Sequence, residues 1–152
     1  MNVFSIQSKP MSPGVYQYAC HRQVSHEYFT TMGIPLLLGR DFTVQDNTIG
    51  PAIILVNQSF VDKFLPDEDP ISQRVKITTP DFMEIVGVVG DVRTTGQGLN
   101  VVDHPPKMYE LVSRYNTHTM KVMVRTQGDQ RALNFEIRDK FARVVPKNHF
   151  AA

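Results

Sequence analysis

The chain has 152 residues, of which 41% are hydrophobic and 20% are charged, and its formal net charge is +1. This ordinary globular composition excludes intrinsic disorder, and so small a net charge excludes a field that would attract nucleic acid or anionic lipid. No stretch approaches the roughly 20 apolar residues of a membrane-spanning helix. The single cysteine, Cys20, excludes an intrachain disulfide.

The N-terminal part of the chain predicts two strands and a short helix. Residues 2–7 and 15–24 alternate between apolar and polar side chains, which is the period of a strand, and a loop with Pro and Gly separates them. Ser25 is then a good N-cap residue for a helix. Tyr28 and Phe29 begin the apolar face of that helix.

The next stretch predicts a helix end followed by a charged corner. Gly33 fits the C-terminal stop of the short helix. Gly39 permits a turn, and Phe42 can anchor that turn in the core. Arg40 and Asp41 can pair with each other or bond backbone carbonyl groups. We therefore expect the corner to be architectural rather than a chemical site, with Arg40 in a structural role.

The central residues predict a strand that leads directly into a helix. Residues 51–57 form a short apolar run bounded by turn signals, which is typical of a buried strand. Asn57 can cap the helix that follows, and Pro66 ends the apolar stripe of that helix. An acidic turn runs from Pro66 to Pro70, and it lacks the spacing of a calcium loop.

Two further strands are predicted at residues 74–78 and 82–89. The glycines within residues 87–98 suggest a phosphate-binding loop at first sight. They lack the spacing of such loops, and no helix pattern follows them. Gly87, inside the strand pattern, predicts a bulge or close backbone packing instead.

The C-terminal residues predict a loop, a strand and a helix. Residues 94–107 read as a long loop, and residues 120–126 alternate cleanly as a strand does. Asp129 can cap a helix that Pro146 closes. Four apolar residues share one face of this helix: Leu133, Ile137, Phe141 and Val144. Strands with scattered helices and no regular βαβ alternation predict an α+β fold.

The residue types that carry chemistry do not gather in any known pattern. The five histidines lack the close pairing that zinc sites favour, and no Gly-x-Ser-x-Gly nucleophile motif occurs. Cys20 and His21 are neighbours on a predicted strand, so their side chains point to opposite faces. We expect no catalytic residue, no cofactor and no metal, and hence no enzyme.

Five segments, in this order, resemble one family: VSHEYFTTMGIPLLLGRDFTVQD, PAIILVNQSFVDKFLPDEDPISQRV, EIVGVVGDVR, PPKMYELV and KVMVRTQGDQRALNFEIRDKFARVVP. Together they are similar to MacB-like periplasmic core domains, from about Phe4 to Pro146. The matching residues are expected to be structural: Ser25, Tyr28, Phe29, Gly39, Arg40, Asp41, Phe42, Asn57, Pro70, Gly87, Gly90 and Asp91. Two departures are Ser72-Gln73, where the family often has Gly-Lys, and Glu110, which leaves open where the strand at Tyr109 ends.

The resemblance implies a mixed, mostly antiparallel sheet with two to three helices. Residues 1–112 would form a strand-rich subdomain with two short helices. Residues 113–152 would form a smaller strand-helix unit like the C-terminal part of the family's porter subdomain. Such domains lie outside the cytoplasmic membrane in permeases of MacB- and FtsX-type ABC transporters. They perform no chemistry, and they couple transport to protein partners such as adaptor or transporter subunits, or to substrates.

The chain departs from such permeases because it lacks their membrane segments, so membrane attachment would come only from segments outside it. The alternative interpretation is a stand-alone binding protein of the same fold. Without a signal peptide, that protein would stay in the cytoplasm. In the family, the strand at 120–126 and the last helix pack against an N-terminal portion that this chain does not contain. We therefore also expect a homodimer or, as the alternative, a rearranged C-terminal helix that covers the exposed core.

Overall fold

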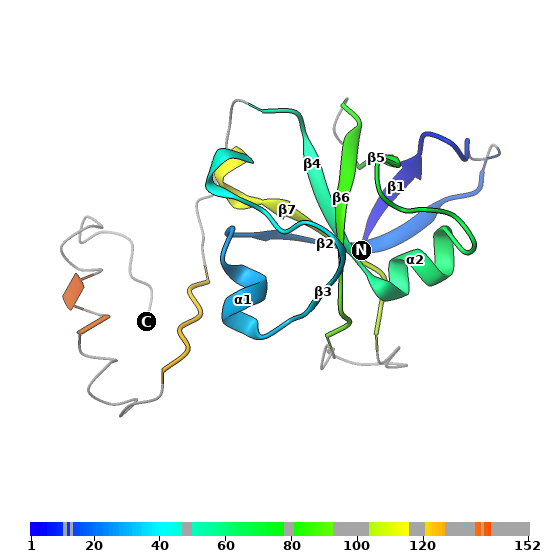
Figure 1. The fold of residues 1–152 in the computed structure, drawn as a ribbon. Helices are drawn as coiled ribbons and strands as arrows, with labels where there is room; N and C mark the ends of the chain where they lie inside the picture. The colour runs from blue at the N-terminus through cyan, green and yellow to red at the C-terminus, as the bar shows by residue number, and fades with distance from the viewer. Residues whose placement is uncertain are drawn as a thin grey trace. The chain divides into compact units, whose positions relative to one another are not determined.

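The computed structural model describes residues 1–10, 12, 14–46, 50–77, 81–92, 104–115, 121–126, 136–137 and 139–140. The chain divides into two compact units, Met1–Lys121 and Val122–Ala152. Every strand and helix with a label below belongs to the first unit (Figure 1).

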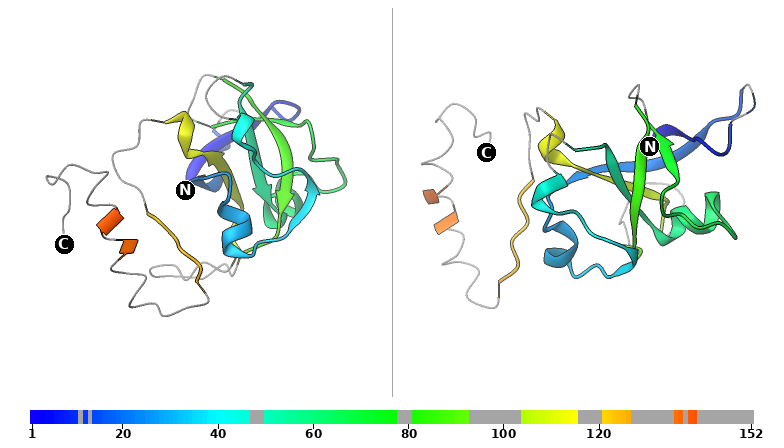
Figure 2. Two further views of the ribbon diagram at one scale, coloured as in Figure 1. Left: turned by 60° about the vertical axis from the view of Figure 1, so that its left-hand side comes forward. Right: turned by 45° about the horizontal axis from the view of Figure 1, so that its top comes forward.

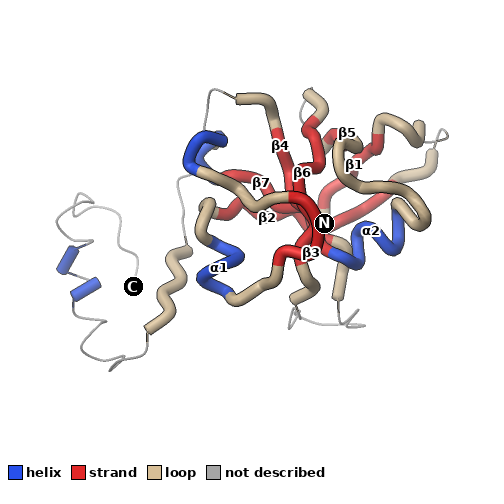
Figure 3. Tube along the Cα trace, viewed as in Figure 1, coloured by secondary structure: helices blue, strands red, loops and turns tan. Residues whose placement is uncertain are grey.

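The described part of the first unit contains seven strands and, scattered between them, short helices. The strands are β1 (Asn2–Ile6), β2 (Gln17–Val24), β3 (Leu36–Gly39), β4 (Ile53–Asn57), β5 (Arg74–Lys76), β6 (Met83–Val89) and β7 (Lys107–Leu111). The α-helices are α1 (Tyr28–Met32) and α2 (Gln58–Phe64), and the 3-10 helices are η1 (Val44–Asp46) and η2 (Val112–Arg114). Figure 3 shows these elements by type.

The sheet closes on itself. Its strand order is β3-β6-β4-β7-β2-β1-β5, and β5 also pairs with β6. Strand β6 bonds β5 near its start and β3 near its end, so six strands form a barrel and β3 extends it at one side. The β2–β7 and β4–β6 pairs are parallel and the other five pairs are antiparallel. This confirms the predicted α+β fold with a mixed, mostly antiparallel sheet.

Two apolar clusters form the core. The barrel cluster takes side chains from all six barrel strands, from Phe60 of α2 and from Leu65 directly after that helix, and the Phe60 ring packs against the ring of Phe4. The α1 cluster lies on the other face of β4, β6 and β7 and includes Phe29 of α1. The two helices therefore cover different parts of the sheet, as the views in Figure 2 show. Strand β4 is buried on both faces because its side chains alternate between the two clusters.

The helix ends follow the local sequence signals, with one correction. Asn57 caps α2, because its side chain accepts a hydrogen bond from the Phe60 amide. Gly33 ends α1 in the left-handed conformation, with a φ of 68°. The prediction that Ser25 caps α1 is wrong: Glu27 holds the N-cap position without a side-chain bond. Ser25 starts a turn before the helix, and its carbonyl oxygen accepts from the Tyr28 amide.

Three parts of the chain differ from the sequence-based prediction. Strand β3 was missed, because its three leucines are all partly exposed and give no period-two pattern. Strand β7 continues through Glu110 to Leu111, and it begins at Lys107, inside the predicted 94–107 loop; residues 93–103 of that loop lie outside the described residues. Residues 121–126 form no strand, because alternation alone makes no ladder and none of the strands in the described part of the chain pairs with them.

The predicted C-terminal helix lies mostly outside the described residues. Residues 136–137 and 139–140 are helical, in agreement with that prediction. Its proposed cap Asp129 lies outside the described part of the chain, as do Leu133, Phe141 and Val144 of its apolar face.

Candidate functional site

The corner after β3 is built on two glycines that allow the backbones to touch. Gly39 has a φ of 72°, and a Cβ atom there would lie 2.2 Å from the Val86 carbonyl oxygen. Opposite it, a Cβ on Gly87 would lie 2.3 Å from the Arg40 carbonyl oxygen. The Arg40 amide donates to the Val86 oxygen at 2.9 Å. Both glycines are therefore required by close backbone packing, as the sequence predicted for Gly87.

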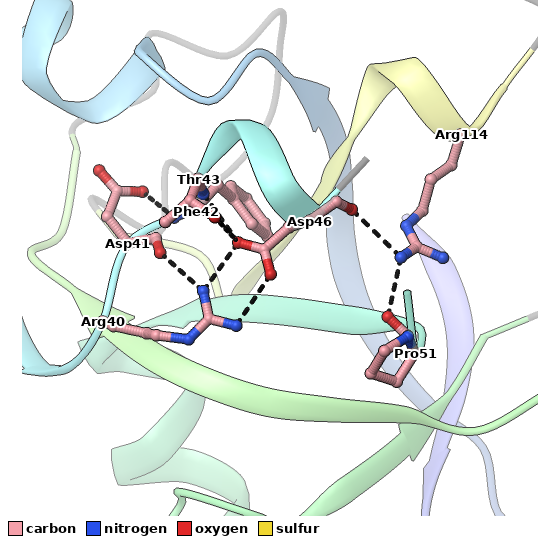
Figure 4. A network of polar contacts seen from close by, with 7 residues as sticks. All are labelled: Arg40, Asp41, Phe42, Thr43, Asp46, Pro51 and Arg114. Atoms are coloured by element: carbon pink, nitrogen blue, oxygen red, sulfur yellow. Dashed lines mark hydrogen bonds and ion pairs between the residues drawn. The ribbon is translucent and has the colours of Figure 1, made fainter. Parts of the chain in front are cut away.

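Arg40 binds a carboxylate, although not that of its neighbour. Its guanidinium group makes two parallel bonds to Asp46, at 2.7 and 2.9 Å, and a third to the Asp41 carbonyl oxygen at 3.2 Å (Figure 4). The predicted pairing of Arg40 with the Asp41 side chain is wrong, because that carboxylate accepts from the Phe42 amide instead. The predicted bond to a backbone carbonyl is confirmed.

Asp46 is the centre of this corner. Besides Arg40, its carboxylate accepts from the amide and the hydroxyl of Thr43, both at 2.8 Å. The hydrogen bonds from Arg40 are the main reason that the pKa of Asp46 is lowered to about 2. The carboxylate is therefore ionised at neutral pH, and it closes the 3-10 turn η1 onto the end of β3.

Arg114 ties the end of β7 to the same connection. Its Nη2 atom donates to the carbonyl oxygens of Asp46, Gly50 and Pro51, at 3.1, 3.0 and 2.8 Å. Figure 4 shows the guanidinium group pointing at the Asp46 and Pro51 carbonyl oxygens. One arginine thus fixes both sides of the connection between β3 and β4 to the turn η2.

Aromatic rings hold the corner and α1 against the sheet. Phe42 is buried, as predicted, and its ring lies 6.3 Å from that of Phe29 between centroids. Phe29 meets the edge of Tyr109 at 4.9 Å, and Tyr28 packs beside both rings. Burial raises the pKa of Tyr109, so its phenol stays neutral. The expected apolar face of α1 is therefore confirmed.

A second polar network joins the ends of β4, β6 and β7. The Asn57 side chain accepts from the Lys107 amide at 2.7 Å and donates to the Pro105 carbonyl oxygen at 3.0 Å. It also donates to Asp91, whose carboxylate accepts from the amide and the hydroxyl of Ser59 at the start of α2. Asn57 and Asp91 together satisfy two amides of the first turn of α2.

Two further motif residues fix chain corners near these networks. A Cβ atom on Gly90 would lie 2.9 Å from the Pro35 ring, and the Gly90 amide donates to the Pro35 carbonyl oxygen. Pro70 is buried, and its carbonyl oxygen accepts from the Gln73 amide. Both residues thus act in packing of the backbone.

Lys107 is a buried lysine within this network. Its ammonium group donates to the Val92 carbonyl oxygen at 2.5 Å. Burial lowers the pKa of Lys107, and Arg22 lowers it further, whereas Cys20 and Asp91 act in the opposite direction. The lysine stem fills space between β7 and the chain after β6, which gives it a packing role.

A third cluster surrounds a buried carboxylate at the other end of β7. Glu110 pairs with the Nε2 atom of His21 on β2, and it accepts from the Tyr115 hydroxyl at 2.8 and 2.9 Å. Burial, followed by the bond to Glu110, raises the pKa of Tyr115 to about 12, so that the phenol keeps its proton and donates. These partners explain how a glutamate can continue a buried strand.

Comparison with known proteins gives the family. The model of the MacB-like periplasmic core domain matches residues 8–140. The chain belongs to this family. The periplasmic region of MacB from Actinobacillus actinomycetemcomitans superposes with a TM-score of 0.67 at 14% identity, over 94% of this chain and 62% of that one. No curated protein matches the chain in sequence.

Two other solved structures share the MacB-like fold. A domain of a putative permease from Porphyromonas gingivalis has a TM-score of 0.62 at 12% identity, over 97% of this chain and 67% of that one. The extracellular domain of the ABC-type transporter YknZ from Gram-positive bacteria has a TM-score of 0.50 at 15% identity, over 72% of this chain and 49% of that one. The chain thus spans less than two thirds of the MacB periplasmic region.

Within the MacB-like fold, the three polar clusters connect loops to the barrel. Among the described residues, no three His, Cys, Asp or Glu side chains lie close enough to hold a metal ion. The helices of the described segments include none that is long and apolar enough to cross a membrane. Each carboxylate in the clusters is engaged by arginine, histidine, amide or hydroxyl donors, which is an arrangement for positioning the backbone.

The sequence identified some members of each network and missed their distant partners. Arg40, Asn57 and Asp91 were singled out, whereas Asp46, Ser59, Lys107, His21, Tyr115 and Arg114 received no role. The spacing of Thr43 and Asp46 is that of a capping residue and an acidic residue three positions later, a signal that could have revealed η1. The three carbonyl partners of Arg114 leave no trace in sequence, since every residue has a carbonyl group.

Proposed function

We propose that the chain is a non-enzymatic extracytoplasmic domain of an ABC transporter permease, and that it couples transport to protein partners or substrate. The observation that carries the proposal is the match to the MacB-like periplasmic core domain over residues 8–140. The polar clusters support it, because all three hold backbone segments in place.

Strand β3 supports a role in protein contacts. Leu36, Leu37 and Leu38 are 43%, 50% and 46% exposed, and among the described residues β3 pairs only with β6. An open strand edge with exposed apolar side chains is the kind of surface that pairs with other chains. Such a surface is one that a partner protein could use for the proposed coupling.

The location outside the membrane can be tested on the native protein. An epitope tag is inserted at Gly14, which has open space around it, and intact cells and spheroplasts are treated with protease. Cleavage in spheroplasts with an intact cytoplasmic membrane supports the proposal. Protection until the cytoplasmic membrane is broken contradicts it and favours a cytoplasmic binding protein of the same fold.

We further infer that residues 1–112 act as the strand-rich subdomain and residues 113–152 as part of a second subdomain. The division of the chain into two compact units supports two subdomains, although the boundary between the units falls after Lys121 rather than after residue 112. Arg114 and Tyr115 accordingly bond to residues of the first unit. In unit 2, Val122, Met123 and Val124 are each about half exposed, and residues 121–126 form no strand. Three consecutive exposed apolar side chains favour self-association.

The purified chain is therefore expected to form a homodimer. Light scattering should give about twice the mass of the 17.3 kDa chain, and Val124→Lys should restore the monomer by placing a charge in the exposed segment. Lys121→Met is the control, since it removes a charge from the same segment. A monomeric wild-type chain at high concentration would contradict the dimer.

A further inference from the structure

The chain that leaves the barrel after β7 is held differently from the barrel itself. The apolar core ends at Leu111, which pairs with Val24 of β2. None of the residues 112–115 belongs to the buried core. Beyond Leu111, hydrogen bonds from Arg114 and Tyr115 anchor the chain instead.

Two sets of hydrogen bonds hold residues 112–115 from different sides. Arg114 reaches the backbone of the β3–β4 connection through three carbonyl oxygens. Tyr115 reaches Glu110, which β2 holds through His21. Between them, the Tyr115 amide donates to the Val112 carbonyl oxygen and closes the turn η2. Neighbouring residues on one short turn thus make both sets of contacts.

We propose that residues 112–115 form an exit latch, which opens as one unit while the barrel stays closed. Opening breaks the bonds of Arg114 and Tyr115 together, because η2 is too short for one residue to leave without the other. The strand pairs up to Leu111 remain, since they rest on apolar packing. Local opening of this kind is common where few apolar contacts hold a segment.

The state of the latch decides whether the backbone after Leu111 is held against the barrel. Residues 112–115 lie shortly before the end of the first unit at Lys121. When the latch is closed, the path of the chain beyond Leu111 is fixed to both β2 and the β3–β4 connection. When it is open, that path is free while the barrel keeps its fold. The latch goes beyond the proposed function, because it is a property of the first unit alone.

Amide hydrogen exchange on the full chain, resolved by residue, tests the latch. Arg114→Met removes the donors and keeps the length of the side chain, and Tyr115→Phe removes only the hydroxyl. Each substitution should speed exchange at the amide of residue 115 by about tenfold. The double variant should speed it by about the product of the two factors, since both contacts break in one opening. The amides of β4 should keep their rates.

Arg22→Met is the matched control, because Arg22 is an exposed arginine on β2. It should leave the exchange at residue 115 unchanged. The proposal is overturned if the amides of β4 speed up by the same factor as residue 115, since that shows a general loss of stability. It is equally overturned if only one of the two substitutions affects residue 115, or if neither does.

Discussion

Strand β4 and the turn η2 are fixed in place by different kinds of contact. All five residues of β4 are at most 4% exposed, and the side chains of its four apolar residues pack into two clusters on opposite faces. The turn η2 contributes no buried side chain and is held by hydrogen bonds from Arg114 and Tyr115. The free energy gained from apolar burial is lost only when the strand leaves the core. The hydrogen bonds of a short turn can instead be replaced by hydrogen bonds to water while the rest of the protein stays folded.

The difference shows where this MacB-like domain can move. The barrel gains its stability from non-directional packing across many strands, so it opens as a whole. The corner at Arg40 and the turn η2 depend on a few directional hydrogen bonds. These bonds fix the geometry of each segment and can break and form again without unfolding the barrel. The coupling role that we propose would use both a body that keeps its shape and attachments that can change.

The largest effect is expected at the glycine corner. Gly39→Ala places a Cβ atom 2.2 Å from the Val86 carbonyl oxygen and puts alanine at a positive φ. The substitution should therefore lower the free energy of unfolding by about 3 kcal/mol or more. Gly14→Ala is the control, because Gly14 has a φ of 83° and nothing within 4 Å of the added atom. Urea unfolding measures the loss of stability in both variants. An equal loss in Gly39→Ala and Gly14→Ala would show that the close contact with β6 contributes nothing.

Asn57→Ala is expected to cost roughly 2–3 kcal/mol of stability. It removes the cap of α2 and leaves the Lys107 amide, which is buried, without its acceptor. Urea unfolding measures the change. Gln58→Ala serves as the control, since it removes only the bond of Gln58 to Asp62 on the helix surface. A loss no larger than that of the control would contradict the role given to Asn57.

Much of the barrel could be predicted from sequence, and most of the polar contacts could not. The strands β4 and β6 and the cap Asn57 gave local signals, because apolar runs and capping residues act on their neighbours. Glu110 was recognised as unusual, but its partners lie on β2 and after η2. The edge strand β3 lacked a signal, since a strand outside the barrel has no fully buried face.

Arg40→Ala is expected to lower stability by about 1 kcal/mol. The Arg40 side chain is 49% exposed, so solvent screens the pair, although its geometry with Asp46 is bidentate. Thermal unfolding of the variant is compared with that of Arg22→Ala, another exposed arginine. A melting temperature equal to that of the wild type would show that the corner does not depend on Arg40.

The smallest effect is the pH dependence of the same pair. The pKa of Asp46 lies below its ordinary value. The contribution of its ionised carboxylate to the free energy of unfolding is therefore fully present above about pH 4 and is lost as the pH falls through about 2. The stability difference between wild type and Arg40→Ala should therefore shrink over this window and stay constant above it. Urea unfolding between pH 7 and pH 2 measures it, and a difference that grows on acidification would contradict the assignment.

The contrast between a packed barrel and polar attachments is tested most directly by native-state hydrogen exchange of the unmodified chain in increasing urea. Amides of β4 and β6 should exchange only through global unfolding, with a free energy that falls steeply with urea. The amides of Asp46 and Tyr115 should exchange through local openings that depend little on urea. Equal free energies and equal slopes at all of these positions would show that barrel and attachments unfold together, and would contradict the account.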